Sequence, residues 1–87
     1  NQIQTKTINL INCKVDYYNM FELKEIRANL NNISVIEKLK IKSLSYKSIE
    51  YDIYYYGNFK ILSDLLSINQ LKLDKLETEN QCRIKLK

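Results

Sequence analysis

The chain has 87 residues, of which 45% are hydrophobic and 28% charged, and its net charge is +4. This length and balance are typical of one small globular domain and exclude a second domain. Histidine is absent and there is one glycine, so the sequence lacks the commonest general base and any glycine-rich nucleotide loop. We therefore expect a domain that is not an enzyme and that binds no cofactor or metal.

Residues 1–6 have no clear pattern and are expected to be a loose leader, so the single domain is predicted over residues 7–87. Because the chain begins at Asn1 rather than at a methionine, we expect it to be a piece of a longer protein. No apolar run approaches the roughly 20 residues of a membrane-spanning helix. We therefore expect no membrane span within these residues.

Residues 7–18 alternate between apolar and polar side chains, which predicts a first strand. Every second residue of this strand is expected to face a core, and the residues between them, which include Leu10, are expected to face solvent. Asn19 then precedes MFELKEIRANL, and Glu22 follows three residues later, a spacing that predicts a capped helix start. The expected buried stripe of this helix comprises Met20, Leu23, Ile26 and Leu30.

Residues 35–45 and 48–56 also alternate with a period of two, so each predicts a strand. If the chain reverses at residues 45–47, a single register matches polar with polar and apolar with apolar side chains. A shift of one residue would place lysines against isoleucines. The predicted pairs are Lys42–Glu50, Lys40–Asp52 and Lys38–Tyr54 on the polar face, with Ile41–Tyr51 and Leu39–Ile53 on the apolar face.

A second helix is expected over residues 59–68, capped by Asn58 and closed by Asn69. Two short alternating runs follow, on either side of residues 78–80, and predict a last strand or a terminal hairpin. The fold class is therefore α+β: a ferredoxin-like split β-α-β arrangement (βαββαβ, with a possible terminal hairpin). In this arrangement an antiparallel sheet carries two helices on one face.

The two cysteines, Cys13 and Cys82, are far apart in sequence and become neighbours if the first and last strands pair. They do not have the spacing of a zinc site. Two interpretations remain open, a pair of small buried thiols and a disulfide in an oxidising compartment.

The polar face of the two central predicted strands is the candidate binding surface. Tyrosines suit protein interfaces because they combine an apolar ring with a polar end, so a protein partner or self-association is the first interpretation. The candidate binding residues are Lys38, Lys40, Lys42, Tyr54 and Tyr56.

Single-stranded RNA binding is the alternative function for the same face. An RNA-recognition motif has this order of elements and stacks bases on aromatic residues of its central strands. Glu50 and Asp52, however, share the face and would repel phosphates, and the exposed positions of the first strand carry no aromatic residue. The alternating charges equally suit lysines that pair with these two acids.

Residues 15–86 resemble the C-terminal region of an uncharacterised family of proteobacterial envelope proteins. The matching pieces are SVIEKLKI at 34–41, YYG at 55–57 and LKL at 71–73. The resemblance implies a non-catalytic interaction or assembly domain of a larger bacterial envelope protein, and it brings no catalytic residues. The periplasm is the expected compartment, with the cytoplasm as the alternative.

Overall fold

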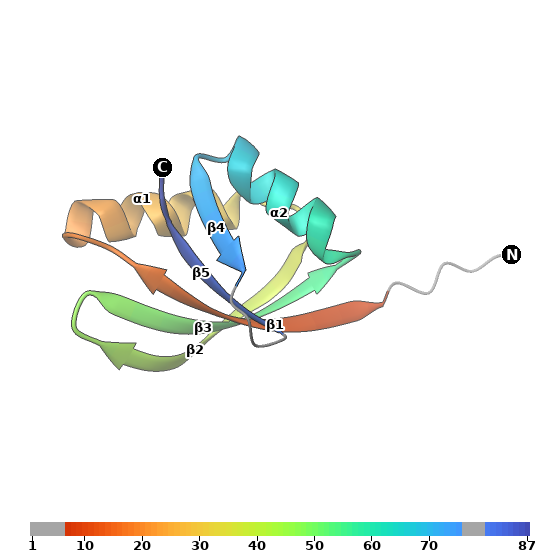
Figure 1. Cartoon of the computed structure of the whole chain (residues 1–87), viewed down its shortest axis with the longest axis horizontal. Helices are drawn as coiled ribbons and strands as arrows, with labels where there is room; N and C mark the ends of the chain where they lie inside the picture. The colour runs from red at the N-terminus through yellow and green to blue at the C-terminus, as the bar shows by residue number, and fades with distance from the viewer. Residues whose placement is uncertain (1–6, 76–79) are drawn as a thin grey trace, which may run out of the picture.

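The computed structural model describes residues 7–75 and 80–87, which form an α+β fold with one five-stranded sheet and two helices (Figure 1). The predicted leader, residues 1–6, and most of the turn predicted at 78–80 lie outside the described residues. The elements, in chain order, are β1 (Ile8–Asp16), α1 (Met20–Asn31), β2 (Ile36–Ser45), β3 (Ser48–Tyr56), α2 (Phe59–Ile68), β4 (Leu71–Lys75) and β5 (Gln81–Leu86).

The sheet is mixed, with the strand order β2-β3-β1-β5-β4. Three neighbouring pairs are antiparallel, but β1 and β5 are parallel. The prediction of an antiparallel sheet is therefore wrong. The terminal hairpin explains the difference. Its first strand, β4, lies at the edge of the sheet, and the chain then reverses, so that β5 lies beside β1 and runs in the same direction.

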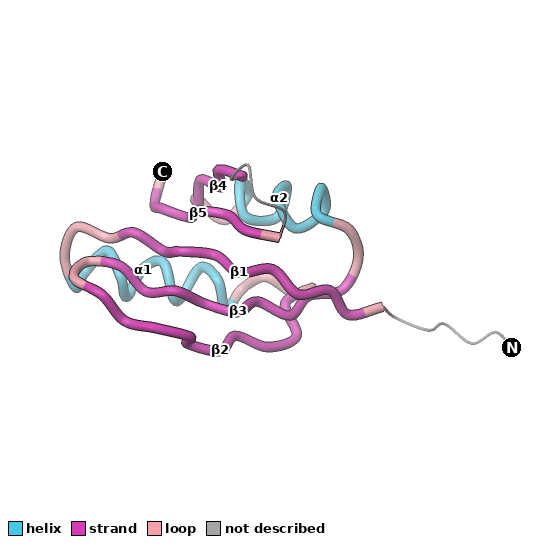
Figure 2. The backbone as a smooth tube through the Cα atoms, turned by 60° about the horizontal axis from the view of Figure 1, so that its bottom comes forward, coloured by secondary structure: helices cyan, strands magenta, loops and turns pink. Residues whose placement is uncertain are grey.

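Both helices lie on one face of the sheet, as Figures 1 and 2 show from two directions. The inward side chains of β1, β3 and β5 pack against the apolar stripes of the helices and form one core. Alternation along β3 is complete, because every second residue is buried. The side chains with the least exposure are Ile26, Leu30, Ile53, Leu62, Leu66, Leu71, Ile84, Val15, Cys13 and Cys82.

Helix α1 begins as the sequence predicts. The Asn19 Oδ1 accepts a hydrogen bond from the Glu22 backbone N–H at 2.9 Å, and the Glu22 carboxylate accepts one from the Tyr18 N–H at 2.9 Å. Met20, however, is 61% exposed rather than part of the buried stripe. The first turn of α1 lies beside the β2–β3 turn at one end of the molecule, where Met20 borders a surface hollow instead of the core.

The β2–β3 hairpin confirms four of the five predicted pairs, including Lys40–Asp52 and Lys38–Tyr54. The Lys42–Glu50 pair is wrong, because the register shifts between Ile41 and Ser43, so that Ser43 stands opposite Glu50. Lys42 is the extra residue of a β-bulge. A second shift lies between Ile36 and Lys38, and such bulges increase the twist of an edge strand.

Helix α2 is capped at both ends by asparagine. The Asn58 Oδ1 accepts from the Ile61 N–H at 2.9 Å, and the Asn69 side chain donates to the Leu65 carbonyl at 2.8 Å. Gly57 precedes this cap with φ +89°, a conformation that disfavours other residues. Across the described ranges, neither helix combines the length and the apolar character needed to cross a bilayer.

Candidate functional site

The candidate site is the face of the sheet opposite the helices, here called the solvent face. Figure 2 shows the strands of this face in front of the helices, and its side chains are those of the alternate strand residues that point away from the core. On β1 and β3 these residues form cross-strand pairs in one uninterrupted register. The solvent face comprises Ile8, Leu10, Asn12, Lys14 and Asp16 on β1, Glu50, Asp52, Tyr54 and Tyr56 on β3, and Lys38 and Lys40 on β2.

One half of the solvent face is apolar. Ile8 stands opposite Tyr56 and Leu10 opposite Tyr54, and the two aliphatic side chains are each 48% exposed. Tyr54 also stands opposite Lys38 on its other side. The tyrosines are half-buried. This arrangement leaves an aliphatic and aromatic cluster in contact with water.

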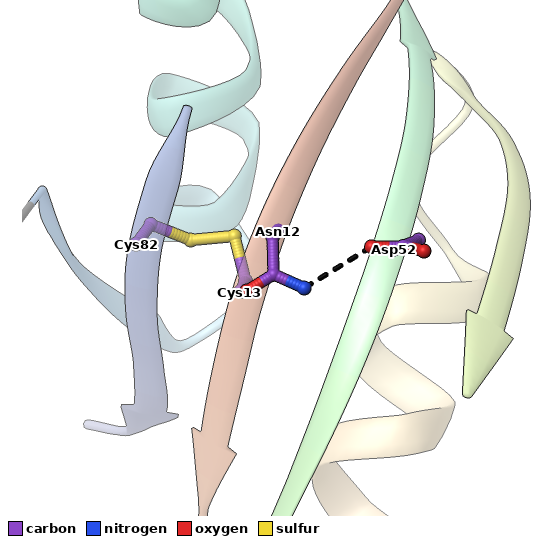
Figure 3. Close-up of a disulfide and its surroundings, with 4 residues drawn as sticks. All are labelled: Asn12, Cys13, Asp52 and Cys82. Carbon is purple, nitrogen blue, oxygen red and sulfur yellow. Dashed lines mark hydrogen bonds between the residues drawn. A yellow bond between two sulfur atoms is a disulfide. The ribbon is translucent and has the colours of Figure 1, made fainter. Parts of the chain in front are cut away.

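The other half of the solvent face is a network of polar contacts. Asn12 donates through Nδ2 to Asp52 Oδ1 at 3.1 Å (Figure 3). Ser43 donates its hydroxyl to Glu50 Oε1 at 2.8 Å, and the Arg83 Nε lies 3.0 Å from a carboxylate oxygen of Asp16. The acids of this face are therefore held by neighbours on three different strands.

The surroundings of Glu50 on this face lower the pKa of its carboxyl group. Hydrogen bonds from Ser43 and, more weakly, from Asn12 lower the pKa of its carboxyl group, and the charges of Lys42 and Lys14 act in the same direction. A lowered pKa favours the ionised form, which is the opposite of what a general acid needs at neutral pH. On the helix side of the same strand, burial raises the pKa of Tyr55.

The predicted site residues are only partly brought together. Lys38, Lys40, Tyr54 and Tyr56 share the solvent face, whereas Lys42 occupies the bulge in β2. The expected ion pairs between lysines and acids are not among the contacts of the described residues, because Asp52 and Glu50 accept from neutral donors instead. The lysine ammonium groups consequently stay in solvent. Two further acids, Glu77 and Glu79, lie outside the described residues.

Cys13 and Cys82 form a disulfide between β1 and β5 (Figure 3). Their Cα atoms are 4.5 Å apart and their side chains are buried. Of the two interpretations that the sequence leaves open, the structure has the disulfide. It joins the two parallel strands at the centre of the sheet.

A groove of about 670 Å³ opens where β1 begins, next to the start of α2. It adjoins the apolar half of the solvent face through Tyr56. Val35 and Ile61 supply apolar walls, and the Gly57 carbonyl accepts a hydrogen bond from the Asn9 side chain. The residues that line the groove are Thr7, Ser34, Val35, Tyr56, Gly57 and Ile61.

A second exposed cluster, here called the aromatic tip, lies at the opposite end of the sheet and was not identified from the sequence. It combines the β1–α1 loop with the β2–β3 turn, which a hydrogen bond from the Tyr17 N–H to the Lys47 carbonyl joins at 3.2 Å. The sequence pattern had assigned Tyr18 and Leu44 to predicted strands, Met20 and Phe21 to a predicted helix and only Tyr46 and Lys47 to a reversal, so it gave no signal that they form one cluster. The aromatic tip comprises Tyr18, Met20, Phe21, Leu44, Tyr46 and Lys47.

Within residues 7–75 and 80–87, no three His, Cys, Asp or Glu side chains group in a way that could hold a metal ion. Comparison of the chain with protein-family models, curated proteins and solved structures found no match. The function is therefore argued from the surfaces described above.

Proposed function

We propose that the chain is a non-catalytic protein-interaction domain of a larger bacterial envelope protein, and that the solvent face is its docking surface. The observation that supports this proposal most strongly is the apolar half of that face. Ile8 and Leu10 remain 48% exposed beside two half-buried tyrosines, although a core is available on the other side of the same strands. Exposed apolar patches rimmed by polar residues are typical of interaction sites.

The chemistry of the face indicates the kind of partner. Aliphatic and tyrosine side chains suit the centre of an interface, where they lose water on binding. Lys38 and Lys40 lie at the edge of the cluster, and neither takes part in an ion pair with the residues that the structure describes. A protein surface with an apolar centre and acidic residues on the Lys38 side is the complementary partner.

The disulfide supports an extracytoplasmic compartment. Disulfides persist in oxidising environments such as the periplasm and are rare in the cytosol. The Cys13–Cys82 bond therefore agrees with the resemblance of residues 15–86 to envelope proteins. We propose the periplasm as the place where this domain meets its partner.

We further propose that the fold is a variant of the ferredoxin-like arrangement. The order β2-β3-β1 with both helices on one face supports this proposal. The variation is confined to the end of the chain, where β5 of the terminal hairpin takes the place beside β1 and runs parallel to it.

Site-specific photo-cross-linking tests the docking proposal. A benzophenone amino acid at position 54 of the full-length protein, expressed in its own bacterium, is expected to give an adduct of discrete mass. The same group at Glu25, on the exposed side of α1, is the matched control. Leu10→Asp is expected to abolish the adduct and Lys14→Asp, on the polar half of the same strand, to retain it. Equal adducts from positions 54 and 25, or none from position 54, would contradict the proposal.

RNA binding is distinguished from protein docking by its salt dependence. Phosphate contacts by lysines release counterions, so the affinity for a single-stranded oligonucleotide would fall steeply with salt. Under the RNA alternative, Tyr54→Ala would remove base stacking and weaken binding. The docking proposal predicts no oligonucleotide binding at low salt, because Glu50 and Asp52 lie beside the tyrosines on this face.

A further inference from the structure

The aromatic tip holds five of the ten large hydrophobic side chains that are exposed among the described residues. Phe21 is 82% and Tyr46 is 87% exposed, and Tyr18, Met20 and Leu44 are also mostly in water. Tyr18 lies in the β1–α1 loop and Tyr46 in the β2–β3 turn, whereas Met20 and Phe21 begin α1 and Leu44 is near the end of β2. These segments lie at the same end of the molecule, at the left in Figures 1 and 2. Exposed apolar side chains at one end of a domain can enter a flat, soft surface together.

The tip is also preorganised. The Tyr17–Lys47 backbone hydrogen bond joins its two segments, and the Glu22 carboxylate fixes the Tyr18 N–H. Between the segments lies a hollow of about 370 Å³ that is bordered by Met20 and Tyr46. Because these loops are already held in place, binding would require little additional ordering of the backbone.

The aromatic tip carries one basic side chain, and the one acid that contacts it, Glu22, is engaged by the Tyr18 N–H. The basic side chain lies within the two segments, residues 17–21 and 44–47. Lys47 is their one charged side chain. Its Nζ lies 4.6 Å from the centre of the Tyr18 ring and 5.3 Å from that of the Tyr46 ring. The cation–π contacts thus hold an ammonium group at the level of the exposed rings, where it can meet an anion.

We propose that the aromatic tip is a membrane-docking site that seats the domain on the headgroup region of an anionic phospholipid bilayer. Tyrosine and phenylalanine side chains partition to the lipid–water interface, and a nearby lysine binds lipid phosphate. This site is separate from the solvent face, so a bilayer and a protein partner could be bound at the same time. The inference does not depend on the proposed docking function of the sheet.

Tryptophan fluorescence gives a direct test, because the chain has no tryptophan of its own. Phe21→Trp places a single reporter in the tip, and Leu10→Trp places one on the solvent face as the control. Vesicles of phosphatidylglycerol and phosphatidylethanolamine are expected to shift the emission of Phe21→Trp to the blue and to leave Leu10→Trp unchanged. A shift in both variants or in neither would overturn the proposal.

Co-sedimentation with the same vesicles measures the contribution of each group. Phe21→Ser with Tyr46→Ser is expected to weaken binding by about tenfold or more, because two rings no longer leave water. Lys47→Asn is expected to weaken binding to anionic vesicles by about fivefold, with no effect on phosphatidylcholine vesicles. Asparagine tolerates the positive φ of 58° at this position.

The competing explanation is a contact between two copies of the chain. It predicts a dimer in sedimentation velocity that the Phe21→Ser and Tyr46→Ser double variant dissolves, together with no binding to vesicles. That outcome would overturn membrane docking. Circular dichroism of the double variant checks its folding, and if it unfolds, the two tryptophan reporters decide the question by themselves.

Discussion

Glu50 is kept ionised by its hydrogen-bond donors, although it lies on an open sheet surface. The Ser43 hydroxyl has the largest effect on its pKa, followed by the Asn12 side chain. Because the pKa is lowered in the folded protein, Glu50 contributes stability above its unfolded pKa. That contribution is lost as the pH falls through the folded pKa.

Glu50→Gln tests this dependence. We expect the wild type to lose more free energy of unfolding than Glu50→Gln as the pH falls below about 4.5, the ordinary value for glutamate. Urea unfolding at a series of pH values measures the difference. Ser43→Ala is the matched control: it keeps the carboxylate but should reduce the acid-dependent loss. Parallel pH profiles for all three proteins would contradict this account of Glu50.

Contacts between single side chains explain why the polar half of the solvent face was only partly predictable. Alternation correctly placed Lys40 opposite Asp52, but it could not show that Asn12, on a strand distant in sequence, would donate to that acid. Met20 has the helical spacing of the buried stripe and is nevertheless exposed, since spacing does not indicate where the sheet beneath a helix ends.

At the scale of single elements, both helix starts were predictable because an N-cap is a local contact. We expect Asn58→Ala to destabilise the fold by about 1 kcal/mol, because the Ile61 N–H loses its acceptor at the start of α2. Asn58→Ser should retain most of the stability. The midpoint of urea unfolding, at unchanged slope, is the measurement. Equal midpoints for Asn58→Ala and Asn58→Ser would show that the cap contributes nothing.

The bulge at Lys42 protects the β2 edge of the sheet. An edge strand offers unpaired backbone groups to other chains, and a bulge with a lysine disrupts such pairing. We expect deletion of Lys42 to leave the Ile41–Tyr51 and Ser43–Glu50 pairs intact, to preserve the fold and to increase self-association.

Sedimentation velocity over a range of concentrations measures the effect of this deletion. Lys42→Ser is the matched control, since it removes the charge and keeps the extra residue. If Lys42→Ser associates as strongly as the deletion, the charge rather than the bulge protects the edge.

The hairpin of β4 and β5 shows what element-scale patterns leave undetermined. The two alternating runs predicted the strands, and Cys82 faces the core. Nothing local specifies which of the two strands sits beside β1, because both carry apolar residues on one face. Pairing of the first and last strands was considered for the two cysteines, but the parallel direction of the β1–β5 pair depends on packing across the whole sheet and was missed.

At the scale of the whole molecule, the disulfide is the strongest single constraint. It closes a loop with a sequence separation of 69 residues, for which the loss of chain entropy in the unfolded state gives about 4 kcal/mol of stabilisation. For a domain of this size that is a large part of the total stability.

Urea unfolding with and without a thiol reductant tests this estimate. We expect reduction, or the Cys13→Ala and Cys82→Ala double variant, to lower the free energy of unfolding by about 4 kcal/mol. The double variant should be insensitive to the reductant, which controls for effects of the reductant itself. A wild type equally stable in both conditions would contradict the prediction.

The two exposed surfaces differ in how far the sequence could predict them. The solvent face follows from alternation within neighbouring strands, so Tyr54 and Lys38 were assigned to it correctly. The aromatic tip joins Tyr18 and Tyr46, which are distant in sequence, through a loop and a turn whose conformation has no periodic signal. Only the three-dimensional fold brings them together.

The position of the Cys13–Cys82 bond also determines how the chain would carry tension. A pull applied to the two termini acts first on the paired ends of β1 and β5 and then passes from the N-terminal to the C-terminal segment through the sulfur atoms. Because the bond closes the stretch between the cysteines, roughly 240 Å of chain cannot be extended until the bond is cut. Within a longer polypeptide under force, this domain would therefore act as a nearly inextensible link.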